Sequence, residues 1–150
     1  MNTKAKTGLA LGLAAASLAL LSAPANAHDP GSKRECSVEM LRGVYLFKGS
    51  GFQPINGAAV PKAIIESIRF NGDGTLVAET VTVTFFGQSP PNRQGGALGT
   101  YTVEPNCTGT LTFADGPRFD TFVSSPLLLN LIQTGPVPAV LLGDARFVSR

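Results

Sequence analysis

The chain has 150 residues, with twelve basic and ten acidic side chains. This length fits one domain that can bury a core. There is no run of basic residues and no interleaving of basic with aromatic residues, which argues against nucleic acid as a partner.

The first residues have the pattern of a secretory signal peptide. Lys4 and Lys6 precede an apolar run from Leu9 to Leu21, and Ala25-Asn26-Ala27 is a small-residue cleavage site. The apolar run is too short to span a membrane comfortably and no later stretch is as long, so we expect no transmembrane segment after cleavage. Because the signal peptide holds two lysines, the remaining chain is formally neutral. The expected organisation is a signal peptide over residues 1–27, an N-terminal segment over 28–42 and a β-barrel domain over 43–150, in a secreted or periplasmic protein.

The two cysteines, Cys36 and Cys107, predict a disulfide, because an even number of cysteines in an exported chain indicates oxidised pairs. Cys36 lies just before the first expected strand and Cys107 at the turn of a later hairpin. The bond would therefore tie the N-terminal segment across one end of the fold. Two unpaired thiols are the alternative. No metal site is expected, since His28 is the only histidine, and the sequence indicates no cofactor.

The chain from residue 36 onward predicts an all-β domain. Residues 36–42 can form one or two helical turns, and no longer helix is expected. We expect strands at 44–48, 63–70, 75–86, in the two arms of a hairpin at 99–113, and at 118–124, 127–133 and 139–148, with loops at 49–51, 54–61 and 87–96. Short connections imply antiparallel neighbours. The prediction is an eight-stranded antiparallel up-and-down barrel, with a β-sandwich as the alternative.

The hairpin at 99–113 has the clearest pattern. Tyr101 and Val103 alternate with threonines on one arm, and Leu111 and Phe113 do so on the other. The apolar residues share a face only if a three-residue loop, 105–107, joins the arms. This loop pairs Tyr101 with Leu111.

Three segments carry a resemblance to a known group of proteins: Gly43-Val-Tyr-Leu-Phe47, Arg69-Phe-Asn-Gly-Asp-Gly74 and Gly99-Thr-Tyr-Thr-Val-Glu-Pro-Asn-Cys-Thr-Gly-Thr110. They resemble small secreted bacterial proteins of unassigned function with a calycin-like barrel similar to that of allene oxide cyclase. The resemblance implies a fold. It carries over no catalytic residue.

Glu66 is the one catalytic or ligand-orienting candidate, because it alternates in register with the apolar residues of its strand. Its expected neighbour depends on the turn at 71–74. In one register Glu66 lies opposite Glu79. In the other, which we prefer, a bulge shifts the pairing, so that Glu66 lies opposite Thr80 and Phe70 lies opposite Leu76. The alternative role for Glu66 is a carboxylate at the barrel rim, paired with an arginine such as Arg69 or Arg118.

The sequence leaves three functions open. The first is binding of a small apolar molecule inside the barrel. The second is an isomerase or cyclase of the allene oxide cyclase-like type, and the third is a structural or interaction protein of the cell envelope. The residues expected to line the lumen are Tyr45, Phe47, Glu66, Ile68, Phe70, Tyr101, Val103, Leu111, Phe113 and Phe147.

The last two strands are apolar on both faces, unlike a barrel strand with one face in water. We therefore expect their outer face to be covered. The loop at 87–98 or the N-terminal segment could cover it, but the loop is polar and rich in glycine. We favour a homo-oligomer instead, with an interface of Leu128, Ile132, Val140 and Leu142.

Overall fold

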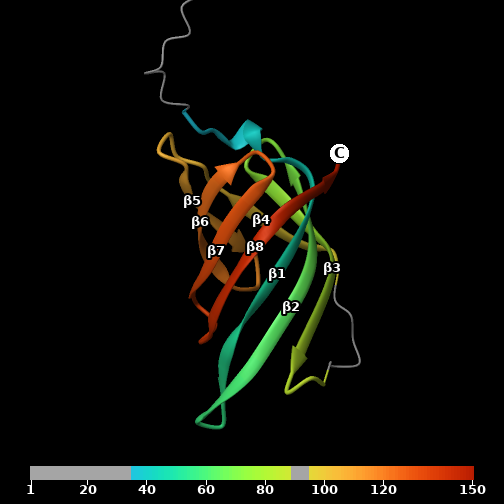
Figure 1. The fold of residues 1–150 in the computed structure, drawn as a ribbon, viewed down its shortest axis with the longest axis vertical. Helices are drawn as coiled ribbons and strands as arrows, with labels where there is room; N and C mark the ends of the chain where they lie inside the picture. The colour runs from blue at the N-terminus through green and yellow to red at the C-terminus, as the bar shows by residue number, and fades with distance from the viewer. Residues whose placement is uncertain (1–34, 89–94) are drawn as a thin grey trace, which may run out of the picture. The chain divides into compact units, whose positions relative to one another are not determined.

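The structure, a computed structural model, describes residues 35–88 and 95–150. Its eight antiparallel strands close into a barrel in which each strand pairs with the next and the last returns to the first (Figure 1). One short 3-10 turn, η1, precedes them. The elements are η1 Val38–Met40, β1 Arg42–Ile55, β2 Ala58–Asn71, β3 Thr75–Phe85, β4 Ala97–Tyr101, β5 Thr108–Phe113, β6 Arg118–Ser125, β7 Leu128–Gly135 and β8 Val140–Ser149. The predicted all-β, up-and-down barrel is confirmed and the sandwich is excluded.

Some of the sequence predictions fall outside the described residues. They are the signal peptide over 1–27, the N-terminal segment as far as residue 34, and residues 89–94 of the loop expected at 87–96.

The first hairpin is much longer than predicted. Strands β1 and β2 have 14 residues each and meet at Asn56 and Gly57, whose φ angles are 50° and 80°. Two successive residues with positive φ form the turn that best suits the twist of a hairpin, and Asn-Gly is the sequence that most favours it. The loops predicted at 49–51 and 54–61 are therefore wrong. The prolines in this region stand inside paired strands.

The hairpin of β4 and β5 is as predicted. Tyr101 lies opposite Leu111, and the N–H of Glu104 donates to the carbonyl of Thr108 at 2.7 Å, which leaves 105–107 as the loop. Cys107 forms a disulfide with Cys36, with the two Cα atoms 5.0 Å apart. The predicted bond is confirmed and the alternative of two unpaired thiols is excluded.

A chain of aromatic rings fills the barrel near η1. Tyr45 meets Phe70 edge to face at 5.1 Å between ring centroids and Phe147 at 5.5 Å, and Phe70 meets Tyr101 at 4.9 Å. Such edge-to-face contacts are favourable beyond the area that they bury. This half of the lumen is thus filled by side chains.

The turn η1 covers this end of the barrel. Leu41, which follows η1, is fully buried in the core. The hydroxyl of Tyr101 lies 3.0 Å from the carbonyl oxygen of Leu41 and accepts the N–H of Gly72 at 3.1 Å. Tyr101 therefore joins the covering segment to the β2–β3 turn. We call the opposite end, toward Asn56 and Gly57, the distal end.

A pair of glycines makes room for one ring farther from η1. Gly49 lies opposite Gly143 on neighbouring strands. A Cβ on Gly49 would lie 2.8 Å from Cζ of Phe47, and a Cβ on Gly143 would lie 2.7 Å from Cε2 of the same ring. These distances are too short for real atoms. The two glycines therefore allow Phe47 to lie against the wall, where its ring also meets Phe119 at 5.7 Å.

No described segment of the chain covers the outer face of β7 and β8. Ile132, Val140 and Leu142 are exposed and Leu128 is partly buried. Part of each segment proposed to cover it, residues 28–34 and 89–94, lies outside the described ranges, so that alternative stays a prediction. The apolar outer face has no partner among the described residues.

Candidate functional site

Glu66 lies inside the barrel, but its neighbour is neither of the two that we predicted. It stands opposite Val81 on β3 and opposite Phe47 on β1. Closer to the turn, Phe70 pairs with Leu76 as expected. The register then shifts between Ser67 and Ile68. The prediction of Thr80 opposite Glu66 is wrong because this second shift lies within the strands, away from the turn.

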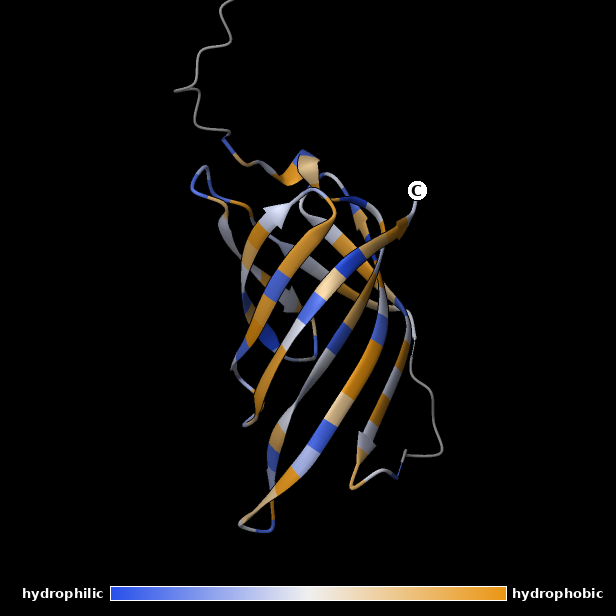
Figure 2. Cartoon of the chain, in the orientation of Figure 1, coloured by the Kyte–Doolittle hydropathy of each residue, from blue (hydrophilic) through white to orange (hydrophobic). Residues whose placement is uncertain are grey.

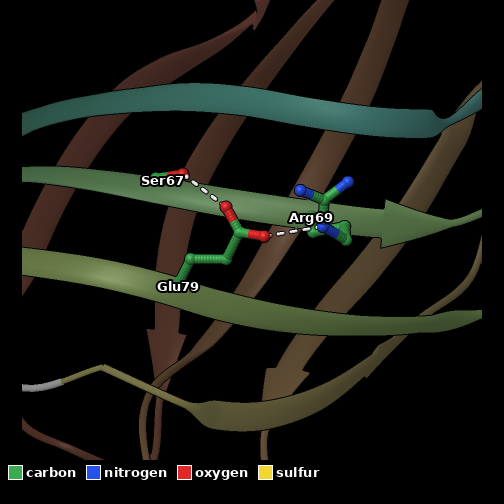
Figure 3. A network of polar contacts seen from close by, with 3 residues as sticks. All are labelled: Ser67, Arg69 and Glu79. Carbon is green, nitrogen blue, oxygen red and sulfur yellow. Dashed lines mark hydrogen bonds and ion pairs between the residues drawn. The ribbon is translucent and has the colours of Figure 1, made fainter. Parts of the chain in front are cut away.

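The shift places Glu79 on the outside of the barrel, as Figure 3 shows. Its carboxylate accepts a hydrogen bond from Nε of Arg69 at 2.6 Å and one from the hydroxyl of Ser67 at 3.3 Å. Arg69 is therefore paired with Glu79 on the outer surface. The proposed rim pair between Glu66 and Arg69 or Arg118 is absent from the described residues.

Glu66 stands among apolar residues of its own strand and the two neighbouring strands. It is 4% exposed, and no hydrogen bond or ion pair joins its carboxylate to another residue in the described ranges. Burial raises the pKa of Glu66 to about 7, while the nearby Lys62 ammonium acts to lower it. Near neutral pH the group is thus divided between its neutral and charged forms.

Lys62 extends the polar character of the site toward the distal end. Its Nζ donates to Oε1 of Gln53 at 3.1 Å and lies 5.8 Å from the centre of the Phe85 ring. Burial lowers the pKa of Lys62, and the charge of Glu66 opposes this. Lys62 influences the carboxylate through its field, without forming an ion pair with it.

A second buried acceptor lies on β7, which β1 and β8 separate from β2 around the barrel. Gln133 is buried, and its Nε2 donates to the carbonyl of Val137 at 2.8 Å. Its Oε1 is buried and has no hydrogen-bond partner among the described residues. A buried acceptor without a donor is unfavourable, so this atom has an unused capacity to accept a hydrogen bond.

The other predicted lumen residues form the core. Phe47 and Ile68 adjoin Glu66. Phe47 is its partner on β1, and Ile68 lies two residues farther along β2 on the same face. The remainder are buried in the core or packed against it, and the structure does not bring them to Glu66: Tyr45, Phe70, Tyr101, Val103, Leu111, Phe113 and Phe147.

The sequence prediction missed Lys62, Gln53 and Gln133. The same alternation that placed Glu66 inside also places Lys62 inside, but the predicted strand began one residue too late to include it. Gln133 alternates with Leu129 and Leu131, and that pattern could have identified it. Gln53 lies between the two predicted loops at 49–51 and 54–61, where no strand was expected.

A cleft of about 900 Å³ lies beside η1, between Glu39, Arg42, Leu127 and Arg150. Glu66 does not line it, so it is separate from the buried site. Within residues 35–88 and 95–150 there is no group of three or more His, Cys, Asp or Glu side chains that could hold a metal ion. No helix in the described ranges is long and apolar enough to cross a membrane.

Comparisons of the chain with protein-family models, with curated proteins and with solved structures gave no match.

Proposed function

We propose that the protein is an exported barrel that binds a small, mainly apolar molecule in its distal half, with Glu66 as the polar anchor. The supporting observation is a buried carboxylate with no hydrogen-bond partner among the described residues. An isolated buried carboxylate is unfavourable, and structural sites seldom keep one without a partner. A ligand that supplies a donor would satisfy it.

The chemistry of the site favours a ligand with a hydroxyl or amino group on an apolar body. Glu66 and the Oε1 of Gln133 are both acceptors that a donor would satisfy. The apolar body would lie against Ile64 and Val81, which are partly buried beside the core. The half of the barrel near η1 is filled by aromatic rings, so the proposed site excludes it.

The proposal also includes export of the protein and its resemblance to a known group of barrel proteins. The disulfide and the signal-like first 27 residues support passage to an oxidising compartment. The closed eight-stranded barrel is compatible with the resemblance to calycin-like, allene oxide cyclase-like proteins. A pKa near 7 would also suit a proton carrier, which favours an isomerase or cyclase as a second candidate.

Native mass spectrometry of the protein purified from its own host tests the binding site. We expect a bound small molecule whose mass disappears on denaturation, and we expect the Glu66→Gln variant to retain much less of it. Glu79→Gln is the matched control, because Glu79 lies on the outer surface. A bare mass for the unaltered protein, together with no binding of solvatochromic dyes, would contradict the proposal.

The exposed outer face of β7 and β8 favours an additional property, self-association. Ile132 lies opposite Leu142. A cleft of about 610 Å³ beside Leu142 is also lined by Ile65 from β2. A second copy of the chain could bury this face through Leu128, Ile132, Val140 and Leu142. The proposed interface is independent of the Glu66 site.

Light scattering at micromolar concentration tests the oligomer. We expect a dimer or larger species that Leu142→Asp converts to a monomer, because the aspartate would have to be buried unpaired in the interface. Leu98→Asp is the matched control, since Leu98 is 64% exposed on β4, which is not adjacent to β7 or β8, and Leu142 is 62% exposed. A monomer that neither substitution alters would contradict the interface. Equal dissociation by both substitutions would do so as well.

A further inference from the structure

Strands β1, β2 and β3 extend beyond the rest of the barrel at the distal end, as Figure 1 shows. The pairing of β8 with β1 ends at Phe52, and the pairing of β4 with β3 covers only residues 75–78. Beyond these points the three strands pair only with one another. We call residues 49–64 and 80–88 the tongue; its first residues, as far as Phe52, still pair with β8.

The tongue holds one charged residue, Lys62, which is partly buried and donates to Gln53, and it carries large apolar side chains at its surface. Phe52, Ile55 and Phe86 are all exposed. Figure 2 shows hydrophobic segments down to the turn between β1 and β2. A single exposed apolar residue needs no explanation, but a projection with several of them and little charge is typical of a contact surface.

The apolar side chains emerge on both faces of the tongue. Phe52 and Phe86 line one shallow cleft of about 500 Å³ on the outer face. Ile55 lies three positions after Phe52 on β1. Because side chains alternate along a strand, Ile55 points to the opposite face, close to the turn. A folded protein partner would cover one face of a thin projection. A fluid lipid surface can surround both faces, so the arrangement favours lipid.

The backbone limits how deep the tongue can enter a bilayer. The edge of β3 from Thr80 to Thr84 pairs with no other strand within the described ranges, and the Asn56-Gly57 turn also exposes peptide groups. Unpaired peptide groups are strongly unfavourable in hydrocarbon. The tongue therefore suits the headgroup region and the first part of the acyl chains, and it does not suit a transmembrane position.

The charges at the base of the tongue fit the same surface. Lys48 is exposed on the outer face of β1, with Asp144 and Arg146 on the neighbouring strand, and Asp144 is already paired with Arg146 at 2.8 Å. This leaves a net positive charge where phosphate groups would lie. Anionic lipids should therefore strengthen the contact.

We propose that the tongue docks the barrel on the surface of a lipid bilayer, with Phe52, Ile55 and Phe86 inserted at the headgroup level and Lys48 near the phosphates. The proposal does not depend on ligand binding at Glu66. The surface adjoins the proposed interface of β7 and β8, because Phe52 lies opposite Val140 and Lys48 lines the same cleft as Leu142. The proposal adds a site of contact that faces away from η1 and the disulfide.

Vesicle flotation with the protein as released by its host tests the proposal. Vesicles of phosphatidylcholine alone are compared with vesicles that also contain phosphatidylglycerol. We expect the protein to float with both, and more strongly with the anionic vesicles. The double variant Phe52→Ser/Ile55→Ser should lower the partition coefficient by about tenfold or more, because two apolar contacts with lipid are lost.

Phe122→Ser is the matched control, because Phe122 is 50% exposed on β6 and Phe52 is 52% exposed on β1. All variants share the same N-terminus, so any difference between them reports on the substituted side chains. Absence of flotation by the unaltered protein would overturn the proposal. An equal loss of flotation in the Phe122→Ser control would also overturn it. A dimer in lipid-free solution that the double variant converts to a monomer, without flotation, would assign the tongue to a second copy of the chain.

Discussion

Replacing Glu66 with glutamine is expected to stabilise the protein by up to about 3 kcal/mol above neutral pH, and to change its stability little near about pH 5. Burial raises the pKa of Glu66 in the folded protein from 4.5 to about 7. The folded state thus keeps a proton that the unfolded state has lost. Glu66 therefore contributes full stability below the unfolded pKa, and this contribution is lost as the pH rises through the folded pKa. Glutamine has no such titration.

Urea unfolding of both proteins between about pH 5 and pH 8 measures the effect as a difference, which removes the contribution of the groups that they share. Glu104→Gln is the control, because Glu104 is exposed beside the 105–107 loop and its substitution should change stability by less than about 0.5 kcal/mol. Parallel pH profiles for the unaltered protein and the Glu66→Gln variant would show that the carboxyl is not desolvated in solution.

Removal of the disulfide by the double substitution Cys36→Ser/Cys107→Ser is expected to lower the free energy of unfolding by about 4 kcal/mol. The bond joins residues separated by 71 positions, so it closes a long loop in the unfolded chain. Loss of the bond also releases the segment that leads into η1. That segment is otherwise held by the hydrogen bond from the Cys36 N–H to the carbonyl of Pro105 at 3.2 Å.

Unfolding with and without a reductant provides the control for this prediction. The reductant should lower the stability of the unaltered protein to that of the double variant and should leave the double variant unchanged. The oxidised protein should show no free thiol under denaturing conditions. Two reactive thiols per chain would contradict the pairing of Cys36 with Cys107.

The features that sequence analysis predicted correctly depend on local patterns. The hairpin of β4 and β5 follows from the alternation around Tyr101 and Leu111, because only an odd loop keeps both residues on one face. The inward position of Glu66 follows from the same alternation. Each of these predictions needs only the residues of one or two neighbouring strands.

The features that sequence analysis missed depend on competition between signals or on contacts between distant residues. Pro54 and Pro61 favour a loop over 54–61, and this signal competes with the hairpin signal of the Asn56-Gly57 turn that lies between them. The second register shift leaves Glu79 as the extra residue on β3, where it bonds to Arg69. No local pattern shows which residue of a strand will be the extra one.

The composition of the candidate site was predicted only in part for the same reason. Glu66 could be identified from its own strand, whereas Gln133 belongs to β7, which is far from β2 in the sequence. The orphaned Oε1 of Gln133 is apparent only when the partners of every buried atom are known. Sequence alone therefore located the carboxylate and missed the acceptor on β7.

The order of the strands also bears on how quickly the chain can fold. Seven of the eight pairings join consecutive strands, and only the pairing of β1 with β8 joins residues about one hundred positions apart. This distant pairing has the highest entropic cost of closure and is expected to form last. The bond between Cys36 and Cys107 shortens the path between β1 and β8 by about half. Halving a loop eases its closure by only about 0.6 kcal/mol, so oxidation before folding accelerates this last step by no more than about threefold.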